Sequence, residues 1–158
     1  MRPLPSRGQA LAEWAARGAV GLVGLVNVAC ALAFLLEPER YAPAFELAGT
    51  PGRVAVQAFG LLFLMWNATY PPVLVWPRAH LTLFGVILLQ QALGLAGETW
   101  LWLGLPSEHA ALRATGLRFI LFDGAGLLLM GAAYAALRAT RTVIGDSPVG
   151  PYNRGRSP

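Results

Sequence analysis

The chain has 158 residues, a length typical of one domain, and 56% of them are hydrophobic whereas only 13% are charged. An ordinary soluble domain carries roughly 25% charged residues, so this composition favours a membrane protein. The net charge of +4 comes from twelve arginines without any lysine, and these arginines flank the apolar runs instead of forming one basic face. We therefore do not expect nucleic acid as a partner, and we expect the lipid bilayer to be one.

Four long apolar runs predict an all-α, single-domain bundle of four transmembrane helices. The expected helices span residues 18–36, 54–76, 81–97 and 116–137, within a transmembrane domain of residues 18–141. The first run is 19 residues long and lacks a polar cleavage zone, which predicts a retained helix and not a signal peptide. Residues 1–17 should form a cytoplasmic segment, and the tail 142–158, rich in Gly, Pro and Ser, should be mobile.

The connecting segments add further expectations. Residues 43–49 predict a short interfacial helical turn closed by glycine, and Trp100 and Trp102 predict a second interfacial segment within residues 98–115. Pro71 and Pro72 should bend or end the second helix, because they lack backbone donors. The short link at residues 77–80 makes the second and third helices antiparallel neighbours.

The distribution of arginines predicts the orientation. With both termini in the cytoplasm, the inner segments hold eight arginines and the outer segments hold four. Because cytoplasmic loops of membrane proteins are enriched in basic residues, we expect both termini to be cytoplasmic, in a bacterial inner membrane.

Polar residues within the apolar runs are the candidate functional residues, because burying them in a bilayer is costly. Gln91, Gly94 and Glu98 share one face of the third helix, and Asp123 on the fourth helix lies on a face that also carries glycines. The sequence therefore predicts that Asp123 faces the bundle interior and contacts the third helix near Gln90, Gln91 or Gly94. The full candidate cluster is Asp123, Gln90, Gln91, Glu98, Arg118 and Asn67.

Two interpretations of Asp123 stay open. It either pairs with Gln90, Gln91 or Arg118 and fixes the register of the helices, or it binds a proton or ligand in a cavity. The glycines at 18, 21, 24, 124, 126 and 131 are interpreted as helix-packing positions.

Metal and thiol chemistry are not indicated. Cys30 is the single cysteine, which excludes a CxxC pair, and its expected role is that of a small buried apolar residue. His80 and His109 should lie on opposite sides of the membrane, where they cannot share a haem or a metal ion. We predict no metal site and assign no catalytic residue.

Short motifs resemble those of DoxX-like small bacterial membrane proteins, which are four-helix bundles with a proline-containing outer loop after the first helix. The matching segments are Leu35–Pro38 (LLEP), Phe45–Gly49 (FELAG), Pro51–Gly52 and Gly60–Leu64 (GLLFL). Some members of that group are associated with quinone-linked sulfur oxidation, so the resemblance implies a quinone as an alternative ligand.

The functional expectation is an accessory or structural membrane subunit, with a membrane protein or another copy of the chain as partner. The alternative is a binder or redox partner of a small hydrophobic molecule such as a quinone, which would use the candidate cluster. A proton-coupled transporter is a third class. A lined cavity around Asp123 would favour binding, whereas tight packing there would favour a structural role.

Overall fold

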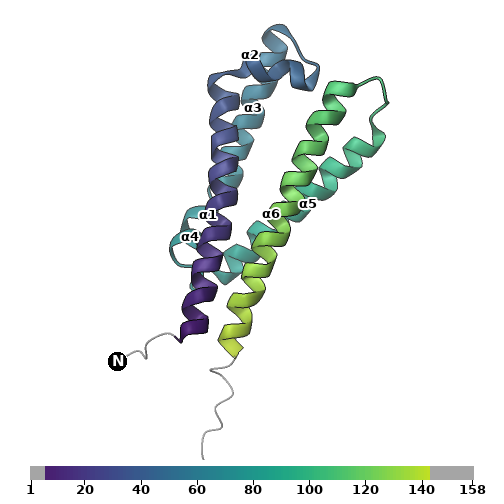
Figure 1. Cartoon of the computed structure of the whole chain (residues 1–158). Coiled ribbons are helices and arrows are strands. Elements are labelled where there is room, and N and C mark those ends of the chain that lie inside the picture. Colours follow the sequence, from purple (N-terminus) through teal and green to yellow (C-terminus); the bar gives the residue numbers. More distant parts are fainter. Residues whose placement is uncertain (1–5, 143–158) are drawn as a thin grey trace, which may run out of the picture.

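The computed structural model of the chain describes residues 6–142, and every regular element in that range is helical (Figure 1). The elements, in chain order, are α1 (Arg7–Leu36), α2 (Pro38–Tyr41), η1 (Ala42–Phe45), α3 (Gly49–Asn67), α4 (Tyr70–Val75), α5 (Leu81–Gly104) and α6 (Ala110–Thr142). Helices α1, α5 and α6 are each long and apolar enough to cross a membrane, and α3 with its bent partner α2–η1 makes a fourth candidate. The predicted all-α class is confirmed.

The long helices alternate in direction between two ends of an elongated molecule. Figure 1 shows the start of α1 and the end of α6 at the lower end, which we call the terminal end. The connections from α1 to α3 and from α5 to α6 lie at the upper end, which we call the loop end. Helix α1 packs against α3, α4 and α6, and α5 packs mainly against α6.

The helices are longer than the apolar runs that predicted them. Helix α1 starts at Arg7 and not at residue 18, because Ser6 and Gln9 form a capping box that begins the helix within the polar segment. Helix α5 continues to Gly104 and α6 extends from Ala110 to Thr142, beyond the expected limits of 97 and of 116–137. Hydropathy marks the apolar part of a helix, whereas backbone hydrogen bonding continues into polar sequence. The predicted tail lies outside the described residues except for Thr142.

The second apolar run is interrupted, as the two prolines predicted. The expected helix 54–76 is divided into α3, which begins earlier at Gly49, and the short α4, with Ala68 and Thr69 between them. Pro71 lies in the first turn of α4, where the missing backbone donor costs nothing because that position has no partner within the helix. The break therefore precedes the prolines.

Short helices occur in only one of the two loops at the loop end. The segment Pro38–Phe45 is bent by 97° from α3, and η1 ends at Phe45, which is followed by Glu46 with a left-handed φ of 54°. Gly49, expected to close this turn, has a φ of 61° and begins α3. The predicted interfacial segment around Trp100 and Trp102 is wrong as a separate element, because α5 continues through both residues. Trp100 and Trp102 are therefore part of the same helix as the preceding apolar run.

Two apolar cores lie along the bundle. The terminal core joins α1, α4, α5 and α6, and its fully buried members include Val20, Val73, Phe84, Met130 and Leu137. The loop core joins α1, η1 and α3 around Phe34, Ala42 and Val56, with Phe63 and Phe119 packed against them. Because α3 makes few direct contacts with α5 or α6, the two cores do not merge.

Arg78, in the turn between α4 and α5, closes the terminal end. Its Nε donates to the Glu13 carboxylate at 2.6 Å. Its Nη2 donates to the backbone oxygen of Gln9 at 2.9 Å and to the Thr140 hydroxyl at 3.1 Å. One side chain thus links α1, the α4–α5 turn and α6.

Candidate functional site

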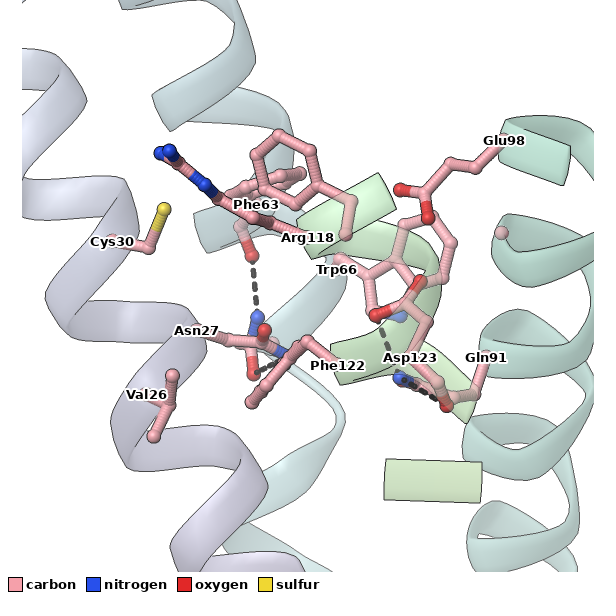
Figure 2. A pocket seen from close by; sticks show the side chains of 13 residues that line it. Val26, Asn27, Cys30, Phe63, Trp66, Gln91, Glu98, Arg118, Phe122 and Asp123 are labelled. Carbon is pink, nitrogen blue, oxygen red and sulfur yellow. Dashed lines mark hydrogen bonds between the residues drawn. The ribbon is translucent and has the colours of Figure 1, made fainter. Parts of the chain in front are cut away.

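A cavity of about 230 Å³ lies where the two cores separate, and α1, α3, α5 and α6 all contribute to its wall (Figure 2). Five of the six candidate residues line it: Asn67, Gln91, Glu98, Arg118 and Asp123. The other lining residues are Val26, Asn27, Cys30, Phe63, Trp66, Gly94, Phe119 and Phe122. Five of the six residues grouped by the sequence thus lie around one space, whose shape the sequence could not give.

Asp123 faces the interior and contacts α5, as predicted. The Gln91 side-chain amide donates to Asp123 Oδ1 at 2.8 Å, and Gln91 is itself almost fully buried. Gly94 gives the carboxylate its space, because a Cβ added there would lie 3.0 Å from Asp123 Oδ2. The Gln91 Oε1 atom accepts a 3.4 Å hydrogen bond from the Tyr70 hydroxyl. Asp123 thus ends a short polar chain that starts on α4.

Asn67 belongs to a second polar group across the cavity. Its side-chain amide donates to the Phe63 backbone oxygen at 2.8 Å, and its Oδ1 accepts from Asn27 at 3.5 Å. Gln90, the sixth candidate, does not line the cavity; its Oε1 accepts from the Thr69 hydroxyl at 3.4 Å. Consecutive residues of a helix point in different directions, so Gln90 faces the α3–α4 break while Gln91 faces the cavity.

Glu98 and Arg118 lie at the cavity without a mutual contact. The Glu98 Oε2 atom is shielded from solvent and has no hydrogen-bond partner within residues 6–142. Arg118 is an exposed residue, and Figure 2 shows its guanidinium on the Cys30 side of the cavity, away from the two carboxyl groups. The expected alternative in which Arg118 pairs with Asp123 is wrong for this arrangement, since no ion pair between them forms in the described chain.

Aromatic side chains form much of the remaining wall. Phe63 and Phe119 approach edge-on with ring centroids 6.0 Å apart, and Trp66 and Phe122 complete the apolar surface. Sequence reasoning missed these residues as site components, because aromatic residues in an apolar run look the same whether they fill a core or line a space. Tyr70, which donates to Gln91, was also missed; it is buried in the terminal core.

A second cavity of about 270 Å³ adjoins the first toward the loop end. Glu98 and Phe119 line both cavities, and the outer wall includes Phe45, Trp102 and Leu112. These two side chains are therefore a wall that the two spaces share.

A polar bridge spans the loop end above these cavities. The His109 Nδ1 and Glu46 Oε2 atoms are 2.6 Å apart, and the Thr115 hydroxyl donates to the Ala44 backbone oxygen at 2.8 Å. The hydrogen bond with His109 lowers the pKa of Glu46, and the same hydrogen bond raises the pKa of His109. This ion pair connects the α1–α3 loop to the start of α6.

The glycines divide into packed and open positions. Gly21 and Gly24 face α4 side chains, and a Cβ at Gly126 would lie 3.2 Å from Gln91 Nε2, so these three are packing positions as predicted. Gly18 and Gly131 have no neighbour within 4 Å of an added Cβ, so the packing interpretation is wrong for them. Cys30 is partly buried; it packs against the loop core and also lines the cavity.

The cavity can bind and orient a small molecule, or exchange a proton, through the ionisable side chains of Glu98, Arg118 and Asp123. No group of three or more His, Cys, Asp or Glu side chains in the described part of the chain is placed to hold a metal ion. Comparisons of the chain with protein-family models, with curated proteins and with solved structures give no match.

Proposed function

We propose that this chain is a bacterial inner-membrane protein with four spans and cytoplasmic termini, and that it binds a small, mostly apolar molecule in the cavity beside Asp123. The observation that carries the proposal is a lined space of about 230 Å³ around an interior carboxylate, where a purely structural residue would be packed. We place the resemblance to DoxX-like proteins within this proposal, with a quinone as one candidate ligand.

The surface supports the membrane part of the proposal. Large apolar side chains are exposed along every long helix, among them Leu25, Leu61, Leu93, Trp100 and Leu128. Exposed apolar area of this extent is unfavourable in water and favourable against lipid. The described ends of α1 and α6 lie at one end of the molecule, which fits an even number of crossings.

The cavity lining supports the binding part. Polar groups of this kind are costly in an apolar interior unless they are satisfied or have a function. Asp123 and Asn67 are held by hydrogen bonds in fixed positions, whereas one carboxylate oxygen of Glu98 is unpaired. Aromatic walls with a few oriented polar groups are the usual composition of small-molecule sites.

Ligand binding is tested with the purified full chain in lipid nanodiscs. We expect the neutral quinone menadione to quench the fluorescence of Trp66, which lines the cavity, and we expect Trp66→Phe to remove the saturable part of the quenching. Exposed Trp14 and Trp100 lie outside the cavity wall, so Trp14→Phe is the matched control. Quenching that is unsaturable, or unchanged in Trp66→Phe, would refute binding of this probe in the cavity.

Orientation is tested by cysteine labelling in intact cells that carry the Cys30→Ala background. Ser107→Cys at the loop end should react with a membrane-impermeant maleimide, and Ser147→Cys in the tail should react only after the cells are opened. The reverse pattern would invert the topology, and labelling of both sites in intact cells would show that α6 does not cross the membrane between them.

An accessory subunit is the second candidate function, and the sparse burial of α5 favours it. In this 24-residue helix only Phe84, Ile87 and Gln91 are buried, so most of its surface is available to lipid or to another protein. Purification in a mild detergent, followed by cross-linking from Leu93→Cys on the exposed face of α5, tests this function. Leu25→Cys on α1 is the matched control for non-selective cross-linking.

A further inference from the structure

The cavity holds two carboxyl groups that have no ion-pair partner within residues 6–142. Figure 2 shows the carboxyl groups of Glu98 and Asp123 directed into the same space from α5 and α6. Both residues line this one cavity, so two ionised carboxylates would repel each other there.

The hydrogen bonds that exist leave acceptor capacity open toward the cavity. Gln91 reaches the Oδ1 atom of Asp123, and Glu98 Oε2 is shielded and unpaired within the described range. A shielded carboxylate oxygen without a donor is unfavourable, because burial removes its hydration and nothing replaces it. A ligand that supplies a positive charge or an N–H donor would remove this cost.

The side-chain amides of Gln91 and Asn67 in the cavity wall are already engaged as donors. The Gln91 amide donates to Asp123, and the Asn67 amide donates to the Phe63 backbone oxygen. Arg118 is the cationic group at the wall, and it is directed away from both carboxyl groups. A neutral ligand that offers only acceptors, such as a quinone ring, therefore finds few partners at Glu98 and Asp123.

The aromatic side chains of the cavity wall also favour a positively charged ligand. Phe63, Trp66, Phe119 and Phe122 line the same cavity as the two carboxyl groups, and aromatic rings attract cations through their quadrupole. Such contacts are strongest when the cation is removed from water. Carboxyl groups and aromatic rings would thus act together on one kind of ligand.

We propose that the ligand of this cavity is an organic cation, either a protonated amine or a quaternary ammonium with an apolar body. The proposal rests on the proposed binding function and adds the charge of the ligand. The volume of about 230 Å³ limits the ligand to a molecule smaller than the drug-sized compounds that fill about 300–1,000 Å³. Its charged group lies between Glu98 and Asp123, and its apolar body lies against Trp66 and Phe122.

The test uses the full chain in nanodiscs and two probes of nearly equal shape. Benzyltrimethylammonium carries the positive charge, and neopentylbenzene replaces its nitrogen by carbon. We expect the cation to bind at least about 10-fold more tightly than the hydrocarbon, as measured by isothermal titration calorimetry. Equal affinities, or a preference for the hydrocarbon, would overturn the proposal.

Two variants assign the preference to the carboxyl groups. Glu98→Gln and Asp123→Asn keep the shape of each side chain, and each should reduce the affinity for the cation by about 10-fold while leaving that for neopentylbenzene within about 2-fold. Glu39→Gln, which removes an exposed carboxylate far from the cavity wall, is the charge-matched control and should change neither affinity. An unchanged preference for the cation in both cavity variants would also overturn the proposal.

The outcomes separate this inference from the proposed function. If menadione and neopentylbenzene bind saturably and the cation does not, the charge assignment is wrong and the binding function stands. If none of the three probes binds to the folded wild-type chain, the binding function itself is wrong.

Discussion

The Gln91 amide and the Asp123 carboxylate are joined by a 2.8 Å hydrogen bond, which links α5 to α6 directly at the cavity. Interhelical hydrogen bonds of this kind contribute about 0.6–1.7 kcal/mol in membrane proteins. A double-mutant cycle with Gln91→Leu and Asp123→Leu should therefore give a coupling energy of about that size, measured by reversible unfolding in detergent.

The same cycle distinguishes stability from binding. Asp123→Leu should leave a folded bundle with a modest loss of stability, because it removes a buried charge together with its hydrogen bond. Binding of the cationic probe should be lost in this variant. Strictly additive effects of the two substitutions would contradict a hydrogen bond between them.

Gly60 marks the closest approach of α1 and α3. A Cβ added at this position would lie 2.7 Å from the Ala31 backbone oxygen, so one of the two helices must shift. Gly60→Ala should lower the free energy of unfolding by about 1–3 kcal/mol, as overpacking does in other cores. Gly18→Ala is the matched control, because nothing lies within 4 Å of its added Cβ. That variant should be neutral or more stable by up to about 1 kcal/mol, since alanine is the better helix former.

Arg78 should be important for stability at the terminal end. Arg78 contacts Glu13, Gln9 and Thr140. Its side chain is only 27% exposed, so solvent screens these contacts incompletely. Arg78→Ala should destabilise the bundle by about 1–3 kcal/mol, because it leaves several partners without a donor. Arg40→Ala removes an exposed ion pair with Glu37 within one helical turn, and its thermal midpoint should not change. Equal midpoints for the two variants would contradict this assignment.

The bridge between Glu46 and His109 should depend on pH in both directions. The pKa of His109 is raised above 6.5, so its contribution is complete below that value and is lost as pH rises through the raised pKa. The pKa of Glu46 is lowered below 4.5, so its contribution is present above that value and is lost as pH falls through the lowered pKa. The bridge is therefore strongest between these two transitions.

Histidine-selective NMR measures this dependence. Glu46→Gln removes the carboxylate and should bring the His109 titration midpoint down toward 6.5. Glu108→Gln is the control, because the neighbouring carboxylate makes the smallest of the contributions that raise the His109 pKa. A midpoint that is equally sensitive to both substitutions would show that the charge of the loop, and not the 2.6 Å contact, sets it.

Much of the fold could be predicted from the sequence because apolar runs are long and interrupted by strong signals. Pro71 and Pro72 predicted the interruption of the second apolar run, because two adjacent residues without a backbone N–H kink or break a helix interior. The ends of α1 and α6 could not be predicted from hydropathy, because polar residues such as Gln9 and Glu13 continue a helix as readily as apolar ones.

The candidate site could be predicted from the sequence only in part. Asp123 and Gln91 were predictable partners because a carboxylate in an apolar run needs a donor and both lie on glycine-bearing faces. Gln90 could not be distinguished from Gln91 in the sequence. In the structure Gln91 contacts Asp123 at the cavity, whereas Gln90, the preceding residue on the helix, contacts Thr69 at the α3–α4 break. The cavity was not predictable, because its existence depends on α3 standing apart from α5 and α6.

The break at Ala68 and Thr69 divides the second apolar run between the two cores. Tyr70 and Val73 of α4 lie in the terminal core, whereas Val56 of α3 lies in the loop core. The cavity wall takes Trp66 and Asn67 from the α3 side of the break and no residue from α4. A change in the angle between α3 and α4 would therefore move one wall of the cavity without disturbing the Arg78 contacts at the terminal end.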